Sequence, residues 1–396
     1  MTQPFKGITV VDMTHVLAGP FAAYQLAVLG ADVIKVEHPA EPDQVRETGT
    51  DPELGRALMG TNYLAQASNK RSLTLDIRTS EGRSALLRLV ERADVFVENY
   101  RAGALADLGL SYDDLRIVRP DLIYCSVTGF GQTGAKRDHT AYDGVIQAAS
   151  GLMSVSGTPE ITPLKVGAPV VDYAAGAMAA FAISSALFQR ERNGGQSQYI
   201  DVSMFDAALM LLSSTLTGYS ANGAMLSVPR GNEFSSSNGC CYQTADGLLM
   251  IAALNSRQHV RLWTVMGRQD IAERSGLEQI SVMEAEMKAE LTRRFGEKSA
   301  AEWETVLNEA GVPAARVRTL PEALAMAQVR ERGVLHHHSN LGRNGIDVPV
   351  APFLFAHDGP KVCAAPPTRG EHTEAILREL GYSDLEIGRM RASAVA

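Results

Sequence analysis

The sequence predicts an α/β fold in which helices cover both faces of a mostly parallel sheet, followed by a smaller α+β domain. Two observations lead to this prediction. Short apolar runs of strand length alternate with helical patterns through the first half of the chain, as is typical of a parallel sheet. A polar stretch at residues 221–240 then separates this half from a segment that contains a hairpin and several helical patterns.

The first three elements form a β-α-β unit. We expect a strand at 8–13, a helix at 19–29 and a second strand at 31–36. The turn after the first strand reads His15-Val-Leu-Ala-Gly-Pro and lacks the glycine pattern that allows close approach to a dinucleotide pyrophosphate. The unit resembles a nucleotide-binding half, but the sequence does not support nicotinamide chemistry.

The alternation continues through the next hundred residues. We expect strands at 71–77, 94–98 and 122–128, and helices at 80–92 and 113–118. The last of these strands leads into the loop Gly129-Phe-Gly-Gln-Thr-Gly, whose residues take turn conformations or offer backbone amides to an anion.

Asp172 is the candidate catalytic residue. It follows an extended apolar run at 166–171 and precedes a helix, rich in small residues, that we expect from 174 to about 190. One interpretation is an N-cap, because Asp accepts hydrogen bonds from the first turn of a helix. The other is a nucleophile, because the surrounding Gly and Ala residues leave room for a bulky thioester. Both interpretations remain open at this point, and they are compatible.

The second half of the chain contains the remaining elements. A strand at 198–202 leads into a helix at 204–216, and after the polar stretch the strands 241–244 and 248–252 form a hairpin. Four helices are expected at 256–266, 281–295, 299–310 and 320–327. The chain is strand-like and rich in proline from residue 336, and it ends with helices at 373–380 and from 383.

Composition excludes several classes of partner. The net charge of -8 and the absence of a long basic run argue against binding to nucleic acid. The four cysteines show neither a metal-binding spacing nor a disulfide framework, which predicts a reducing compartment and no metal site. The chain begins without a signal-peptide pattern, and its longest apolar candidate, 173–188, is too short to span a membrane. We therefore expect a cytoplasmic protein without a membrane partner.

Eight local stretches, spread over essentially the whole chain, form a distinctive set. They are Asp12-Met-Thr-His-Val-Leu-Ala-Gly-Pro, Gly30-Ala-Asp-Val-Ile-Lys-Val-Glu, Asn69-Lys-Arg-Ser, Val97-Glu-Asn-Tyr, Gly129-Phe-Gly-Gln-Thr-Gly, Ala141-Tyr-Asp, Val171-Asp-Tyr-Ala-Ala-Gly and Gly370-Glu-His-Thr. In their order and spacing these stretches together resemble the class III CoA-transferases, the CaiB/BaiF family that includes formyl-CoA transferase and carnitine CoA-transferase.

The resemblance implies a domain organisation. It implies a Rossmann-like large domain that is built from both ends of the chain, and a homodimer whose subunits are interlinked like rings. The N-terminal part of the large domain would span 1–200, a linker helix 201–224, the small α+β domain 225–330, and the return linker with the C-terminal part of the large domain 331–396.

The resemblance also implies a mechanism, in which Asp172 attacks the acyl-CoA donor and then carries CoA as an aspartyl thioester. A carboxylate suits this role because its acyl derivatives lie close in energy to the thioester, so that each exchange is reversible. Coenzyme A thioesters would be substrates, with no permanently bound cofactor. CoA would lie along His15, Val16, Ala18, Lys70, Arg71, Asn99, Tyr100, Arg101, Ala104 and Tyr142.

Three departures from the family pattern bear on the substrate. Leu17 stands where formyl-CoA transferases have Gln, a Ser-rich loop replaces their run of glycines, and His38 and Asp107 replace basic residues. We expect a short dicarboxylic acceptor with succinyl-CoA as the donor, and Arg46 to hold the second carboxylate, unless Arg46 is only an exposed loop residue. The predicted substrate residues are Leu17, Arg46, Ser235, Ser236, Ser237, Asn238 and Gly239.

Structural roles are the alternatives for the predicted CoA ligands. Lys70 and Arg71 are plausible phosphate partners, but they are equally compatible with a solvated strand entrance. His15 is also compatible with a turn that caps the following helix, and Tyr100 with core packing.

Two other functions compete with CoA transfer. The first is alpha-methylacyl-CoA racemase, a relative that pairs an Asp with a His, and here Tyr142 occupies the place of that His. A phenol is a poor proton acceptor at neutral pH, which argues against racemisation, although His139 lies three residues away. The second is a CoA-binding protein without catalysis, in which Asp172 is only a helix cap.

Overall fold

The computed structural model describes residues 2–223, 231–233, 236–274 and 277–396. The chain divides into two compact units, each described here by itself. The large unit consists of Met1–Leu152, Lys165–Gly223 and Arg330–Ala396, and the small unit consists of Met153–Leu164 and Ala224–Val329.

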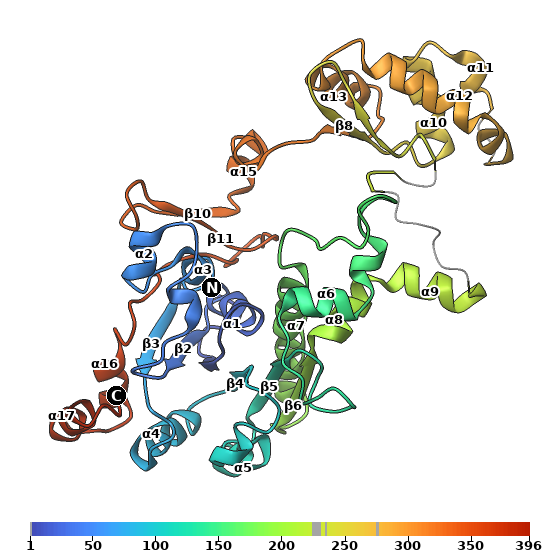
Figure 1. The fold of residues 1–396 in the computed structure, drawn as a ribbon. Helices are drawn as coiled ribbons and strands as arrows, with labels where there is room; N and C mark the ends of the chain where they lie inside the picture. The colour runs from blue at the N-terminus through green and yellow to red at the C-terminus, as the bar shows by residue number, and fades with distance from the viewer. Residues whose placement is uncertain (1, 224–230, 234–235, 275–276) are drawn as a thin grey trace. The chain divides into compact units, whose positions relative to one another are not determined.

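The large unit is built on a six-stranded sheet in which all neighbouring strands are parallel. The strand order is β3-β2-β1-β4-β5-β6, which is the order of a doubly wound Rossmann-like sheet (Figure 1). The strands are β1 (Thr9–Met13), β2 (Asp32–Glu37), β3 (Lys70–Thr74), β4 (Val95–Glu98), β5 (Ile123–Thr128) and β6 (Gln198–Ser203).

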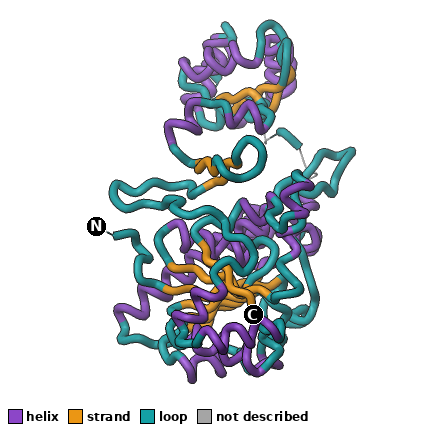
Figure 2. The backbone as a smooth tube through the Cα atoms, turned by 90° about the vertical axis from the view of Figure 1, so that its left-hand side faces the viewer, coloured by secondary structure: helices purple, strands orange, loops and turns teal. Residues whose placement is uncertain are grey.

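Helices cover both faces of this sheet, and Figure 2 shows its strands enclosed between them. Because side chains alternate along a strand, Val10 packs into the core below α1 and α7, whereas Val11 packs into the core on the opposite face. The first face carries α1 (Ala18–Val28), α7 (Val170–Arg192) and α8 (Met204–Leu211), and the second carries α4 (Ser80–Val90), α5 (Tyr112–Val118), α16 (Thr373–Glu379) and α17 (Asp384–Ala392).

The C-terminal segment completes the large unit beside β3, the edge strand of the sheet. The backbone N–H of Thr74 donates to Thr373 Oγ1 at 3.0 Å, and Ile376 and Leu377 enter the core beside Leu73. Segments from both ends of the chain therefore contribute to the large unit.

Short elements surround the sheet of the large unit. The expected helix at 204–216 is interrupted at Leu212, so that α8 ends and a second helix, α9, begins there. The sequence did not predict α2, α3 or α6. The remaining elements are α2 (Pro52–Arg56), α3 (Thr61–Leu64), α6 (Asp143–Ala149), α9 (Ser213–Asn222), and the antiparallel pair β10 (Leu335–His338) and β11 (Ile346–Pro349).

The small unit has a core of its own around Trp263, Phe295 and Trp303. The predicted hairpin forms from β7 and β8, and β9 adds an unpredicted third antiparallel strand. The expected helix at 320–327 is two short helices instead. The elements are β7 (Cys241–Gln243), β8 (Leu248–Ile251), β9 (Ala314–Arg316), α10 (Ser256–Val265), α11 (Gln269–Ala272), α12 (Leu277–Phe295), α13 (Ala300–Glu309), α14 (Leu320–Leu324) and α15 (Ala327–Arg332).

Two predicted boundaries require correction. The helix expected to link the domains at 201–224 belongs to the large unit, because α8 packs against α6, α7 and β6. Residues 153–164, which the sequence assigned to the large domain, belong to the small unit.

Helix α7 is longer than the sequence predicted. It starts at Val170 and has 23 residues, so it is long and apolar enough to cross a membrane by length and composition. The sequence had indicated that the apolar candidate 173–188 is too short to span a membrane, and the helix extends beyond that candidate at both ends. Its apolar character has a structural explanation, because Ala175, Ala179 and Ile183 are buried in the main core of the large unit.

Candidate active site

A cavity of about 400 Å³ lies in the large unit beyond the carboxyl ends of β1, β4 and β5. In the strand order of this sheet, β1 and β4 are the neighbours from which the chain proceeds in opposite directions. Doubly wound sheets bind their ligands at such a switch point, because the loops that follow the two strands separate there. The cavity is lined by residues 15–18 after β1, by residues 99–102 after β4, and by residues 127–129, 137 and 139–142 at and after β5. Asp172 and Met204 complete the lining.

Asp172 lies in the first turn of α7, and it is not the N-cap that the sequence allowed. The N-cap is Pro169, which offers no side-chain acceptor. Asp143 takes the capping role from the start of α6: its Oδ2 accepts hydrogen bonds from the backbone N–H of Val171 at 2.8 Å and of Asp172 at 3.2 Å. The Asp172 carboxylate is thus released from capping and lines the cavity.

The surroundings of Asp172 change its acidity. Burial, with a further contribution from the neighbouring Asp143 carboxylate, raises the pKa of Asp172 to about 7. A carboxyl group with this pKa exchanges its proton near neutral pH, and its anion is less stabilised than that of an exposed Asp. These are properties of a nucleophile or of a proton acceptor.

Close packing of α1 against α7 brings Asp172 to the cavity. A Cβ atom at Gly176 would lie 2.5 Å from the carbonyl oxygen of Ala18, so only glycine allows the two helices to approach this closely. Gly19 allows a different close approach, between the start of α1 and the turn after β1, because a Cβ atom there would lie 2.5 Å from Thr14 Cγ2. Gly176 is therefore the glycine that permits the short distance between α1 and the start of α7.

Most predicted CoA-binding residues line this one cavity. Asn99 connects the turn after β1 to that after β4: its Oδ1 accepts from the His15 N–H and its Nδ2 donates to the His15 carbonyl, both at 2.7 Å. His15 Nε2 lies 3.1 Å from the Tyr100 hydroxyl, and burial lowers the pKa of His15. His15 does not cap α1, whose N-cap is Leu17. The predicted residues in the lining are His15, Val16, Leu17, Ala18, Asn99, Tyr100, Arg101, Tyr142 and Asp172.

Lys70, Arg71 and Ala104 do not line the cavity. Lys70 is buried, and its Nζ donates to Asp12 Oδ2 and to the Pro20 carbonyl, both at 2.9 Å, so it is neither a phosphate ligand nor a solvated strand entrance. Arg71 pairs with Asp32 at 2.7 Å and with Glu379 at 2.9 Å. The predicted phosphate contacts of Lys70 and Arg71 are therefore replaced by ion pairs that join elements of the fold.

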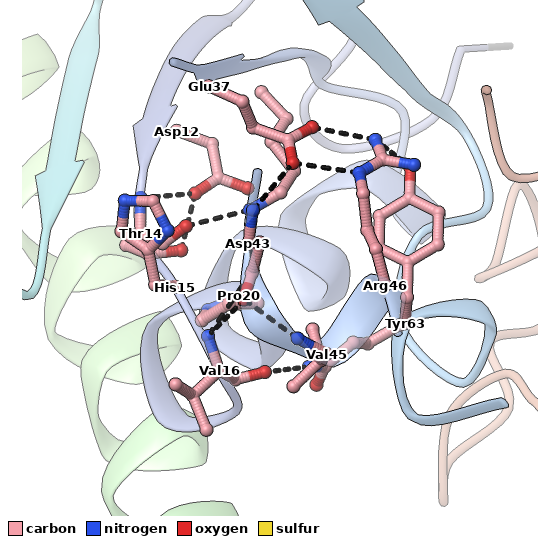
Figure 3. Close-up of polar contacts among 12 residues, drawn as sticks. Asp12, Thr14, His15, Val16, Pro20, Glu37, Asp43, Val45, Arg46 and Tyr63 are labelled. Carbon is pink, nitrogen blue, oxygen red and sulfur yellow. Dashed lines mark hydrogen bonds and ion pairs between the residues drawn. The ribbon is translucent and has the colours of Figure 1, made fainter. Parts of the chain in front are cut away.

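Arg46 is also a structural residue (Figure 3). Its side chain is completely buried and makes a bidentate ion pair with Glu37, at 2.7 and 2.6 Å. The guanidinium carbon lies 3.8 Å from the centroid of the Tyr63 ring. Arg46 is therefore not available to bind the second carboxylate of an acceptor, and it is not an exposed loop residue either.

The predicted Ser-rich loop belongs to the small unit, and Ser235 lies outside the described residues. The backbone N–H of Ser237 donates to Glu284 at 2.5 Å, and Ser236 Oγ donates to the same carboxylate at 3.4 Å. The Asn238 amide is buried between His259, at 2.9 Å, and the Trp263 indole N–H, at 3.2 Å. Ser237, Asn238 and Gly239 are buried, which gives them a structural role within the small unit.

Sequence reasoning missed two features of the cavity. Arg137 lines it together with Arg101, and both residues also line an adjacent cavity around Tyr112. Arg137 follows the Gly129 loop, but nothing in its local sequence distinguishes it from an exposed basic residue. Asp143 was quoted only as part of a family pattern, and its hydrogen bonds to α7 require two helices whose contact a single sequence does not reveal.

Comparisons with known proteins identify the family. A model of CoA-transferase family III matches residues 5–373. The chain is 34% identical to a succinate–glutarate CoA-transferase of Agrobacterium fabrum, over 95% of this chain and 96% of that protein. It is 31% identical to the succinyl-CoA:glutarate CoA-transferase of Homo sapiens, over 99% of this chain and 90% of that protein.

A solved structure shows the same fold. The crystal structure of a CaiB/BaiF family protein from Brucella suis matches with a TM-score of 0.82 and 32% identity, covering 96% of this chain and 100% of that chain. The family model spans most of the sequence, and relatives above 30% identity match nearly end to end. The chain therefore belongs to CoA-transferase family III, the CaiB/BaiF family.

Proposed function

We propose that this CoA-transferase moves CoA from succinyl-CoA to a short dicarboxylic acid and that Asp172 carries CoA between them. The observation that carries this proposal is the position of Asp172, whose carboxylate is released from capping by Asp143 and lines the cavity at the switch point of the sheet. The names of the two relatives support the donor and the acceptor class, because each names succinate or succinyl-CoA together with glutarate.

The reaction requires four balanced exchanges. A carboxylate oxygen of Asp172 attacks the carbonyl carbon of succinyl-CoA and expels the CoA thiolate, which leaves a mixed anhydride. The thiolate then attacks the Asp172 carbonyl, releases succinate and forms the aspartyl-CoA thioester. The acceptor carboxylate attacks this thioester, and the expelled thiolate finally takes the acyl group of the acceptor, which regenerates Asp172.

The environment of Asp172 suits these exchanges. The attacking form is the anion, and with a pKa of about 7 a substantial fraction is ionised at neutral pH. The same partial burial limits the water that reaches an anhydride or thioester at this position, and hydrolysis would end the cycle without transfer.

Arg101 and Arg137 are the residues that we assign to the negative charges of the substrates, in place of Arg46. Both residues belong to the lining of the cavity that contains Asp172. Arginine binds carboxylates and phosphates through paired N–H donors, so these two side chains suit the distal carboxylate of a dicarboxylate or a CoA phosphate.

We further propose that two copies of the chain assemble through the outer side of α7, α8 and α9. Large apolar side chains are exposed there, which is the usual mark of a surface that another protein covers. Light scattering should then give twice the 42.5 kDa of one chain. The exposed residues are Met178, Phe181, Phe188, Met210, Leu211, Leu216 and Tyr219.

Intact-protein mass spectrometry tests the proposed chemistry. After mixing with succinyl-CoA, the wild-type chain should gain the mass of CoA, and glutarate or another short dicarboxylate should discharge it. Hydroxylamine should release the adduct, and Asp172→Ala should not form one. Absence of an adduct with both succinyl-CoA and acetyl-CoA would refute the transferase mechanism at Asp172.

The same samples test the racemase alternative, which the structure makes specific because His139 lines the cavity together with Asp172. A racemase would exchange the hydrogen beside the thioester of a branched acyl-CoA with solvent deuterium. We expect no such exchange, and no loss of transfer activity in His139→Gln. Deuterium incorporation without a CoA adduct would favour racemisation.

A further inference from the structure

We propose that Asp43, Lys35 and Gln66 are positioning residues that hold the turn after β1 in a strained conformation and thereby shape the CoA-binding wall of the cavity. The inference deepens the proposed function, because its effect on CoA rests on the assignment of this cavity. Its effect on the backbone can be measured without CoA. None of the three residues lines the cavity itself.

The strain lies at Val16. Its φ angle is 69°, in the left-handed region that β-branched residues rarely occupy. The residues on either side of Val16, from His15 to Ala18, all line the cavity that contains Asp172. A relaxation of Val16 to an ordinary conformation would therefore redirect the backbone of this wall.

Side chains hold both backbone groups of Val16. Its N–H donates to Asp43 Oδ1 at 3.0 Å and to Oδ2 at 3.2 Å, and its carbonyl accepts from Gln66 Nε2 at 2.8 Å. Gln66 is buried, and its Oε1 has no hydrogen-bond partner among the described residues. Burying an amide group whose oxygen has no hydrogen-bond partner costs free energy. The hydrogen bond from Nε2 to the Val16 carbonyl is therefore the contact that accounts for the position of the Gln66 side chain.

The residues before Val16 are held in the same way. The Thr14 carbonyl accepts from Lys35 Nζ at 2.7 Å, and the Thr14 N–H donates to Asp12 at 3.0 Å. Together with the two bonds from Asn99 to His15, all six backbone polar groups of residues 14–16 bind side chains. This short turn is therefore defined by surrounding side chains and not by a regular backbone pattern.

Asp43 and Lys35 are themselves fixed by buried charge, and Figure 3 shows the contact between Asp43 and Glu37. Lys35 Nζ lies 3.1 Å from Asp43 Oδ2, with both side chains almost fully buried. The Asp43 N–H donates to Glu37 at 3.2 Å, and Glu37 is paired with Arg46. Asp43 thus connects the turn to an ion-pair network that cannot move without separating buried charges.

Amide hydrogen exchange tests the backbone part of the proposal. We expect the peptide covering residues 13–18 to exchange at least about 10-fold faster in Asp43→Asn than in the wild type, because the charged acceptor of the Val16 N–H is lost. The matched control is Arg190→Met. Arg190 forms a less deeply buried pair with Asp94, at 2.8 Å, at the opposite ends of the strands, and its substitution should leave this peptide unchanged.

Binding of free CoA, measured by calorimetry, tests the consequence for the site. Asp43→Asn should weaken CoA binding about 10-fold, and Arg190→Met should leave it within twofold of the wild type. Adding Val16→Gly to Asp43→Asn should recover part of the affinity, because glycine occupies the left-handed region without strain. A merely structural loss of stability would not be recovered by this second substitution.

Several outcomes would overturn the proposal. Unchanged exchange of residues 13–18 in Asp43→Asn would show that Asp43 does not hold the turn. Faster exchange with unchanged CoA affinity would show that the turn does not shape a CoA site. If Asp43→Asn does not fold, Gln66→Met carries the same test without stranding a charge, with an expected threefold effect on both readouts. The proposed function can also fail separately. If the wild type forms no CoA adduct, but Asp43→Asn exchanges the amides of residues 13–18 faster than the wild type, the proposed function is refuted and the positioning role is supported.

Discussion

Two groups of carboxylates lie near the carboxyl ends of the strands, and they differ in whether a lysine is paired with them. Asp12 pairs with Lys70 at 2.9 Å, and Asp43 pairs with Lys35 at 3.1 Å. Asp172 lies beside another carboxylate, Asp143, whose oxygen is occupied by two backbone amides. Asp172 lines the cavity, whereas Asp12, Asp43 and Asp143 do not.

The pKa values follow this difference. Burial by itself would raise the pKa of Asp12, but Lys70 and Lys35 outweigh burial and lower it below its ordinary value. Asp172 is partly buried and lacks such compensation, so its pKa rises to about 7. The lysines therefore keep the buried structural carboxylates ionised, whereas Asp172, which has no lysine beside it, holds its proton up to a higher pH.

The largest effect is expected when Asp172, the carboxylate without a lysine partner, is removed. We expect Asp172→Asn to reduce kcat for CoA transfer on the order of 10⁴-fold, because no other carboxylate is among the described residues that line the cavity. The Kd for free CoA should stay within a few-fold of the wild-type value, which separates chemistry from binding. Retention of more than a tenth of the wild-type kcat would exclude Asp172 as the carrier of CoA.

Removing a compensating lysine should act on stability. Lys70→Met leaves Asp12 buried without its partner, and we expect the free energy of unfolding in urea to fall by about 3–5 kcal/mol. The control is the neighbouring Arg71→Gln, which breaks partly exposed pairs and should cost less than about 1 kcal/mol. Equal losses in the two variants would contradict the contrast between buried and exposed pairs.

The approach of α7 to α1 can be tested with a single methyl group. Gly176→Ala places a Cβ atom against the carbonyl of Ala18, and we expect a loss of about 1–3 kcal/mol in stability together with a higher KM for the acyl-CoA. Gly218→Ala in α9 is the matched control, because a Cβ atom there meets nothing within 4 Å. The control should gain up to about 1 kcal/mol from its higher helix propensity.

The raised pKa of Asp172 predicts a pH dependence with a definite sign. The folded state holds the proton of Asp172 more tightly than the unfolded state, so this group stabilises the fold below about pH 4 and loses that contribution as the pH rises through about 7. At pH 8, Asp172→Asn should therefore be more stable than the wild type by roughly 1–2 kcal/mol, and at pH 4 the difference should vanish. Thermal unfolding across this range measures the difference.

The kinetic counterpart of this prediction is an increase of kcat/KM with a midpoint near pH 7, since the Asp172 anion is the proposed nucleophile. Burial also raises the pKa of Glu98 to about 7. The profile should therefore be repeated with Glu98→Gln, in which the midpoint should persist. If the midpoint near pH 7 were absent from the Glu98→Gln profile, the titrating group would be Glu98 and not Asp172.

The sequence predicted the parts of the fold that depend on local pattern. Alternating apolar runs placed all six strands of the sheet, and the small-residue helix placed Asp172 close to a helix start. It did not show which charges pair across the fold. Lys70 was expected to bind CoA because of the family resemblance and its charge, and Arg46 was expected to bind a carboxylate. Lys70 instead meets Asp12, which comes next to it only after β1, β2 and β3 have paired, and Arg46 folds back onto Glu37.

The misplaced start of α7 has a similar origin. Pro169, Val170 and Val171 favour extended backbone in isolation. In the folded chain, the Asp143 carboxylate satisfies the amides of Val171 and Asp172 and extends the helix toward its N-terminus. That contact joins α6 to α7 across 28 residues, which propensity alone does not reveal.

The use of both chain ends in one unit has a consequence for synthesis on the ribosome. The core beside β3 is completed by Ile376 and Leu377, which are translated about 300 residues after Leu73. At about 5–20 residues per second, the apolar flank of this edge strand stays uncovered for roughly 15–60 s after it emerges. During that interval the nascent sheet presents an open edge and an unfilled core, so we expect the half-made chain, and not the finished protein, to be the form that needs a chaperone.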